Sequence, residues 1–158
     1  MRVLGIDPGA SGAIALLDTE QNTIAVIDMP CVDIRRGTRN VRHVSAQALS
    51  LVVAALQPID HAVVERVHSM PGQGVASTFA FGRAFGVCEG VLAGAGVRYT
   101  DVAPATWMRA LRLTGGKDAA RHMAMQLFPT EAERFGRKKD DGRADATLLA
   151  VYGARVIA

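Results

Sequence analysis

The sequence predicts an α/β fold, a five-stranded mixed sheet flanked by helices in which the first three strands are antiparallel. Two observations support this prediction. Three short apolar runs separated by turns open the chain, at residues 2–7, 13–18 and 23–28, a pattern typical of an antiparallel meander. Two later apolar runs, at residues 61–66 and 97–102, alternate with helical patterns and indicate strands that helices cover.

Helical patterns occupy the segments between and after the later strands. Ser45 is a favourable N-cap for a helix that runs to about Leu56, with apolar residues at helical spacing. Further helices are expected over residues 75–93, from Pro104 onward, over residues 117–128 and over residues 141–156. With 158 residues and no internal repeat or linker, we expect one domain over residues 1–158.

Two charged segments are expected to lie outside regular structure. Residues 30–43 are basic and predict a loop, and residues 130–139 are polar and predict a flexible loop with one helical turn. Phe79, Phe81 and Phe85 lie on the long helix, and we expect them to pack in the core.

The composition is that of an ordinary globular protein, with 49% hydrophobic and 21% charged residues. We find no uninterrupted apolar run of about 20 residues, the length that crosses a bilayer. The first residues enter a strand at once, so we expect no signal peptide. Two cysteines without paired spacing indicate reduced thiols. We therefore expect a cytoplasmic protein with no membrane contact.

Four carboxylates stand at the ends of predicted elements. Asp7 ends the first strand, Glu65 ends the fourth, and Asp141 and Asp145 open the last helix. The last two are four residues apart and so share one helix face. Clustered carboxylates repel each other unless a cation neutralises them, and Mg²⁺ prefers such oxygen ligands. This pattern predicts a site for two Mg²⁺ ions that hydrolyse a phosphodiester, with all four acids as catalytic metal ligands.

Each acid also has a structural alternative. Asp7 can form the turn that Pro8 and Gly9 continue. Glu65 can pair with Arg66 or with a loop arginine. Asp141 can be an N-cap, with Asp145 favoured by the helix dipole in the first turn.

The ordered motifs resemble the RuvC family of Holliday-junction resolvases, within the ribonuclease H-like superfamily. The resemblance rests on Gly-Ile-Asp7-Pro-Gly, Val-Val-Glu65 and Arg-Ala-Asp145-Ala. Three further stretches are similar to the bacteriophage-type branch: Val-Ala-Pro-Ala-Thr-Trp107, Gly116-Lys117-Asp118-Ala-Ala-Arg121 and Lys-Lys-Asp-Asp141-Gly. The resemblance implies a ribonuclease H-like fold and a homodimer that nicks four-way DNA junctions with Mg²⁺ or Mn²⁺.

The resemblance also implies roles for single residues. Asp7, Glu65 and Asp145 match family metal ligands. The family usually places an acid or histidine three residues before the last Asp, where this chain has Gly142. We therefore assign Asp141 as the fourth ligand and keep Asp140 as the competing choice.

Basic residues are expected to hold the DNA. Lys117 opens a helix and matches a family lysine near the cleaved phosphate, and arginines 35–42 can follow backbone phosphates. A solvated surface is the alternative for each group. The predicted DNA-binding residues are Lys117, Arg35, Arg36, Arg39, Lys138 and His68, the last in a loop where family members carry an aromatic wedge.

Gly82, Gly86 and Gly90 recur every four residues on the long helix. Glycine lowers helix stability by about 1 kcal/mol relative to alanine, so the stripe indicates close packing against another backbone. The family resemblance favours a homodimer through this helix, and packing within the monomer is the alternative.

Two other functions remain open. The Gly-Ile-Asp-x-Gly start and the following hairpin are also found in nucleotide-binding phosphotransferases of the actin and sugar-kinase type. That fold needs a second lobe and a second phosphate loop, for which this chain shows no pattern. The other alternative is a non-catalytic junction-binding module.

Overall fold

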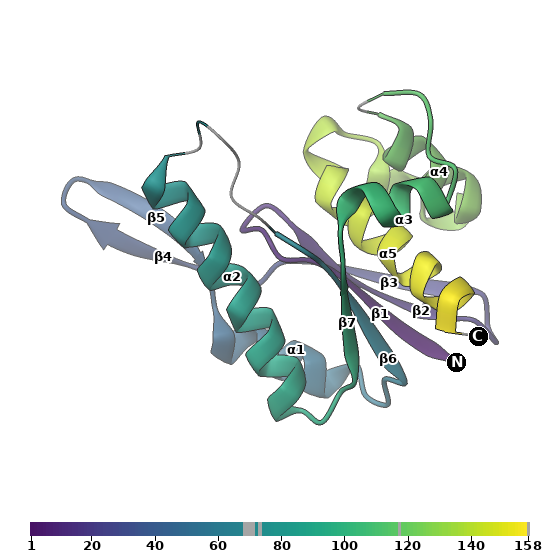
Figure 1. Cartoon of the computed structure of the whole chain (residues 1–158), viewed down its shortest axis with the longest axis horizontal. Coiled ribbons are helices and arrows are strands. Elements are labelled where there is room, and N and C mark those ends of the chain that lie inside the picture. Colours follow the sequence, from purple (N-terminus) through teal and green to yellow (C-terminus); the bar gives the residue numbers. More distant parts are fainter. Residues whose placement is uncertain (68–71, 73, 117, 158) are drawn as a thin grey trace.

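The computed structural model describes residues 1–67, 72, 74–116 and 118–157, without the side chains of Arg36 and Arg39, and confirms the five-stranded mixed sheet (Figure 1). The strand order is β3-β2-β1-β6-β7, antiparallel from β3 to β1 and parallel from β1 to β7. The strands are β1 (Arg2–Asp7), β2 (Ala13–Asp18), β3 (Thr23–Asp28), β6 (His61–Glu65) and β7 (Tyr99–Val102).

Helices cover both faces of the sheet (Figure 1). One face packs against α1 (Ala46–Ala55) and α2 (Val75–Gly94), and the other against α3 (Pro104–Ala110), α4 (Ala119–Leu127) and α5 (Asp141–Ile157). Ser45 caps α1 as expected, because its hydroxyl accepts a hydrogen bond from the Ala48 amide at 3.2 Å.

Alternation along the strands produces two separate cores. Val3 and Val63 face α5, whereas Leu4 and Val64, one residue further along, face α1 and α2. Because β1 and β6 are covered on both faces, their side chains are apolar up to the final residue of each strand. The first polar side chains of these strands, other than those at their start, are therefore the acids at their carboxyl ends.

The expectation of a basic loop over residues 30–43 is wrong. The segment forms a separate antiparallel hairpin of β4 (Cys31–Arg36) and β5 (Arg39–Val44), which extends away from the main sheet (Figure 1). Gly37 has a φ of +62° in the two-residue turn, a conformation that glycine adopts without cost. The hairpin packs weakly, and Val32 and Ile34 on β4 stay largely exposed.

The segment 130–139 is also more regular than expected. It forms two 3-10 helices, η1 (Pro129–Phe135) and η2 (Lys138–Asp140). The reason is that Phe135 is fully buried against the core, which anchors the segment. Smaller differences concern β7, which begins at Tyr99, and α4, which begins at Ala119.

The helix α2 is long and apolar enough, by length and composition alone, to cross a membrane. It nevertheless carries Arg83 and Glu89, and it packs Ala84, Cys88 and Leu92 against the sheet. These three residues cover part of the core, and most of the helix stays outside it.

Candidate active site

Asp7 and Glu65 lie side by side at the carboxyl ends of two neighbouring parallel strands. In the β1–β6 register Ile6 is opposite Val64, so the next position of each strand is an acid. Alternation places both acids on the face that carries Val3 and Val63, which is the face covered by α5. The sheet thus presents two carboxylates to one helix.

The helix α5 lies directly on β1 because the residues between them are small. A Cβ at Gly5 would come within 2.0 Å of the Ala146 carbonyl oxygen, and one at Gly142 within 2.9 Å of Asp7 Oδ2. Both distances are shorter than any real contact, so both glycines are required by close approach. This packing brings Asp145, one residue from Ala146, to the same end of the sheet as Asp7.

Asp7, Asp141 and Asp145 line a common cavity of about 420 Å³, which we call the acid cavity. The turn between β1 and β2 forms one wall, and Phe81 of α2 lies on another side. Lys138 and Lys139 of η2 complete the lining. Glu65 is not part of the lining.

The crowding of these acids changes how they ionise. Burial, and then the charge of Glu65, raise the pKa of Asp7 to about 6. Burial, followed by the charges of Asp7, Glu65 and Asp141, raises the pKa of Asp145 to about 8. Burial also raises the pKa of Glu65. Asp7 and Asp145 therefore feel the negative charges of neighbouring predicted acids, although these acids come from three distant elements.

Each of three acids has a partner within the protein. Trp107 Nε1 donates a hydrogen bond to Glu65 Oε1 at 2.9 Å, and the Gly9 amide donates one to Asp7 Oδ1 at 3.4 Å. Arg121 Nε lies 2.8 Å from Asp141 Oδ1. Within the described part of the chain, no three acids, histidines or cysteines already surround a single point as metal ligands.

Arg121 contacts one of the four acids, Asp141, and the sequence analysis did not predict this contact. It is buried on α4, and besides Asp141 it contacts the Asp118 carboxylate and donates to the Gly136 carbonyl oxygen at 3.3 Å. It therefore joins α4, the segment before η2 and the start of α5. Trp107 was missed in the same way. Both residues belong to motifs of the sequence resemblance, which was the only signal for them.

Asp140, the competing choice for the fourth metal ligand, is already in contact with two arginines. It is buried, and its two oxygens accept hydrogen bonds from Arg137 Nε at 3.1 Å and Arg137 Nη2 at 2.9 Å. Its Oδ2 also accepts from the Arg137 amide, and Arg143 lies nearby. These contacts, the Arg137 hydrogen bond foremost, lower the pKa of Asp140. Its carboxylate thereby caps the N-terminal end of η2.

The structure also decides some of the alternatives for the other acids. Arg66 does not pair with Glu65, because its guanidinium is bound to Asp101 on β7. Asp7 does contact its turn, as the hydrogen bond from Gly9 shows. Asp141 lies at the start of α5, where the N-cap alternative places it. Its carboxylate, however, pairs with Arg121.

The predicted DNA-binding residues have mixed outcomes. Lys138 lines the acid cavity, and Arg35 is exposed near the tip of the hairpin. His68 and Lys117, and the side chains of Arg36 and Arg39, lie outside the described residues.

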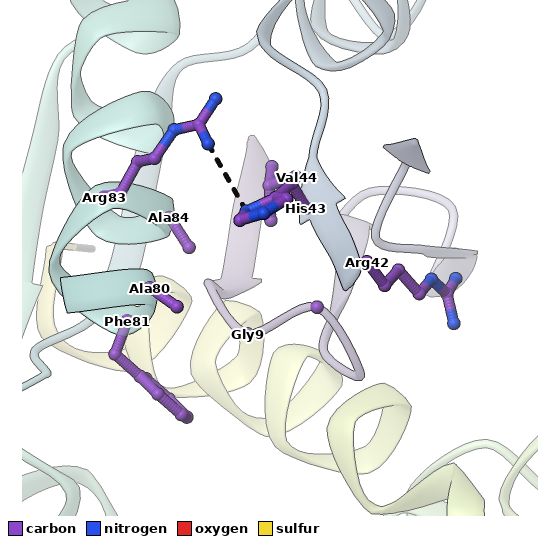
Figure 2. Close-up of a pocket in the computed structure, with 9 residues that line it drawn as sticks. Gly9, Arg42, His43, Val44, Ala80, Phe81, Arg83 and Ala84 are labelled. Carbon is purple, nitrogen blue, oxygen red and sulfur yellow. Dashed lines mark hydrogen bonds between the residues drawn. The ribbon is translucent and has the colours of Figure 1, made fainter. Parts of the chain in front are cut away.

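A second, smaller cavity of about 90 Å³ lies between β5 and α2, beside the turn that borders the acid cavity (Figure 2). There Arg83 Nη1 of α2 lies 3.3 Å from His43 Nδ1 of β5. Phe81 lines both cavities. The expectation that Phe79 and Phe81 are core residues is wrong, because they are 69% and 45% exposed, whereas Phe85 does pack against the core.

The glycine stripe of α2 faces open space. A Cβ at Gly82, Gly86 or Gly90 would meet no heavy atom within 4 Å among the residues described. The alternative of close packing within the monomer is therefore wrong.

Comparison with known proteins supports the resemblance. The chain is 32% identical over 127 residues to "Holliday junction resolvase MOC1, chloroplastic" of Chlamydomonas reinhardtii, a match that covers 75% of this chain. The chain spans only 14% of the length of that relative. No protein-family model matches the chain.

The fold is that of RuvC. Thermus thermophilus RuvC in complex with a Holliday junction substrate superposes with a TM-score of 0.63 and 17% identity, over 98% of this chain and 95% of RuvC. A second Thermus thermophilus RuvC structure gives a TM-score of 0.60 and 19% identity, over 98% and 96% of the chains. The predicted ribonuclease H-like fold and the resemblance to RuvC are confirmed, and the bacteriophage-type branch stays a prediction.

Proposed function

We propose that this protein is a structure-selective DNA endonuclease that cuts four-way junctions, and other branched DNA, by metal-dependent phosphodiester hydrolysis. The observation that carries the proposal is the acid cavity. Asp7 of β1 and Asp145 of α5 line it, and burial followed by the charges of neighbouring acids, Glu65 of β6 among them, raises the pKa of both, at the edge of a sheet with the RuvC fold. Such a cluster is costly without a cation and matches the needs of phosphate chemistry.

The residues present fit Mg²⁺, with Mn²⁺ as a substitute. All four acids, Asp7, Glu65, Asp141 and Asp145, offer carboxylate oxygens, the ligands that Mg²⁺ prefers. Burial and mutual repulsion push the pKa of Asp7 and Asp145 upward, which is the state that a bound cation relieves. Two ions held by these acids would activate the attacking water and stabilise the charge on the leaving oxygen.

The protein's own residues prepare this site. Trp107 fixes one oxygen of Glu65, and Arg121 holds one oxygen of Asp141. In each case the second oxygen has no hydrogen bond or ion pair with a described residue. Gly142 allows α5 to approach Asp7, because any side chain at that position would collide with the carboxylate. The collision supports Asp141, one residue earlier, as the proposed fourth acid in place of a side chain at the family position 142.

Basic residues around the cavity would bind the DNA backbone. Lys138 lines the cavity beside the acids, where its charge would attract a phosphate. We extend the proposal to the arginines of the hairpin, Arg35, Arg36 and Arg39, and to Lys117 and His68. Arg35 is exposed on a hairpin that stands clear of the sheet, which is where a duplex arm can reach it.

The homodimer would form through α2. Its stripe of Gly82, Gly86 and Gly90 faces open space, and the exposed side chains of Val75 and Phe79 belong to the same helix. Exposed apolar area of this kind indicates a contact surface. A symmetric pair of active sites would suit a junction, which is itself two-fold symmetric.

The deciding experiment compares a synthetic four-way junction, a fork and a linear duplex, each with and without Mg²⁺. We expect Mg²⁺-dependent nicks that are strongest on the junction. Asp7→Asn should lower the cleavage rate roughly a thousandfold, because metal catalysis contributes several kcal/mol, yet it should retain junction binding. Full nicking by Asp7→Asn would refute the assignment of the site.

The same substrates, together with an assay of ATP hydrolysis, separate the alternatives. ATP turnover without nicking would favour a phosphotransferase lobe, and junction binding without nicking would favour a non-catalytic module. The expectation of a cytoplasmic bacterial or phage protein stays a prediction, since the algal relative is chloroplastic.

A further inference from the structure

A second polar pocket adjoins the acid cavity. It has a volume of about 200 Å³ and shares Lys139 and the turn residues Ala10, Ser11 and Gly12 with that cavity. We call it the cationic pocket. Its charged lining residues come from four places in the chain: Asp28, Arg42, the η2 region with Arg137, Lys139 and Asp140, and Arg143.

The cationic pocket unites two basic segments that are far apart in the sequence. Arg42 comes from β5 of the hairpin, and Arg137 and Lys139 come from the segment before α5. Figure 2 shows Arg42 pointing away from α2, whereas His43, the next residue of β5, points toward it. The hairpin base is held at this place because Cys31 Sγ donates a hydrogen bond to the Ala10 carbonyl oxygen at 3.5 Å.

Two of the four basic side chains are already neutralised. Arg143 binds both oxygens of Asp28, at 2.6 and 2.7 Å, and Arg137 binds both oxygens of Asp140. Arg42 and Lys139 make no ion pair with any described carboxylate. Two positive charges are therefore in excess in the pocket, and they stand next to the cavity that holds the acids.

We propose that the cationic pocket binds one backbone phosphate of the DNA strand that is cut, a neighbour of the phosphate held at the acid cavity. Guanidinium and ammonium groups are the usual partners of phosphate oxygens. The shared wall and the shared Lys139 mean that one strand passing the acid cavity also passes this pocket. This inference rests on the proposed nuclease function and adds the path of the strand.

The test uses the full chain in EDTA and junctions in which single phosphates near the exchange point are replaced by neutral methylphosphonates. With the wild-type chain, we expect one replacement to weaken binding roughly tenfold, the size of one charge-assisted hydrogen bond. With Arg42→Gln, the same replacement should have almost no further effect. The slope of log K against log salt should also fall by about 0.9.

Arg98→Gln is the matched control, because Arg98 is exposed and precedes β7, at the opposite end of the parallel strands from the acids. It should keep the full sensitivity to the methylphosphonate. The inference is overturned if Arg42→Gln remains as sensitive as the wild type at every position, or if it weakens all substrates without a preferred position. Because Arg42 is exposed, a thermal melt should show an unchanged fold.

The outcome is separable from that of the proposed function. The nuclease proposal fails if no Mg²⁺-dependent nicks are found. This test instead measures DNA binding alone, without metal. Nicking together with an Arg42-independent methylphosphonate profile would reject only the cationic pocket.

Discussion

Glycines serve opposite purposes at the acid cavity and on the outer face of α2. Gly5 and Gly142 have backbone or carboxylate atoms where a Cβ would stand, at distances of 2.0–2.9 Å. Gly82, Gly86 and Gly90 have nothing within 4 Å in the described structure. The first group lets α5 lie on β1 and bring acids together, and the second leaves a bare helix surface.

The difference shows that two regions of one domain obey different constraints. The acid cavity is crowded in both volume and charge, so small changes there should be costly. The face of α2 is unconstrained within the monomer, so changes there should matter only if another chain covers it. Each prediction below tests one side of this contrast.

The charge crowding predicts an unusual pH dependence for the metal-free protein. The folded pKa values of Asp7 and Asp145, about 6 and about 8, lie above the unfolded value near 3.8. Their contribution to stability is therefore full below about pH 4 and is lost as the pH rises through 6 and 8. In EDTA, the melting temperature should fall between pH 4 and pH 8, and each pKa unit of the two shifts corresponds to about 1.4 kcal/mol of lost stability.

Two further melting curves identify the cause. Asp145→Asn should flatten the fall, because the amide cannot ionise, and added Mg²⁺ should restore the melting temperature at pH 8. A melting temperature that rises from pH 6 to pH 8 without metal would contradict the crowded cavity.

Volume crowding predicts that Gly142→Ala is destabilising. The added methyl group would come within 2.6 Å of the Ser11 carbonyl oxygen and 2.9 Å of Asp7 Oδ2, so α5 must shift. Overpacking of this kind costs about 1–3 kcal/mol. Urea denaturation would measure the loss, with Gly82→Ala as the control that adds the same methyl group in open space. Equal losses of stability for the two substitutions would mean that the acid cavity is no more crowded than the open face of α2.

Much of this site is predictable from the sequence, and the reasons are local. Asp7 and Glu65 end apolar runs, and Asp145 follows Asp141 at helical spacing, so a sheet edge and a helix start are enough to suggest their meeting. Trp107 and Arg121 are not predictable as partners of these acids, because their contacts depend on how α3 and α4 pack. The pair of Asp28 and Arg143 joins residues 115 positions apart, and no local pattern marks it.

The hairpin was missed for a different physical reason. β4 and β5 pair with each other and bury little, so the apolar alternation that marks a strand is weak there. Val32 and Ile34 do alternate with charged or polar neighbours, and Gly37-Thr38 provides a two-residue turn. The many arginines in this segment obscured the alternating pattern of a strand. One of these arginines, Arg42, lines the cationic pocket beside the acid cavity.

The ion pair between Arg121 and Asp141 predicts a measurable energetic coupling. Arg121→Gln should lower the free energy of unfolding, because Arg121 is buried and joins three segments. In the Asp141→Asn background the loss should be smaller, by a coupling energy of about 1 kcal/mol. A double-mutant cycle by urea denaturation measures this value. Additive losses would mean that the two side chains act independently and that Arg121 does not position the acid.

The smallest change in stability is expected for a substitution on α2. The sign of that change tells whether a second chain covers the helix. In an isolated monomer, Gly86→Ala should stabilise the helix by up to about 1 kcal/mol, because alanine is the better helix former and its methyl group meets open space. If a second copy packs its backbone on the stripe, the same methyl group weakens the dimer. Thermal melts measure the stability of the monomer fold, and light scattering over a range of protein concentrations measures the dimerisation constant. A stabilised fold with an unchanged dimerisation constant would show that the dimer uses another surface.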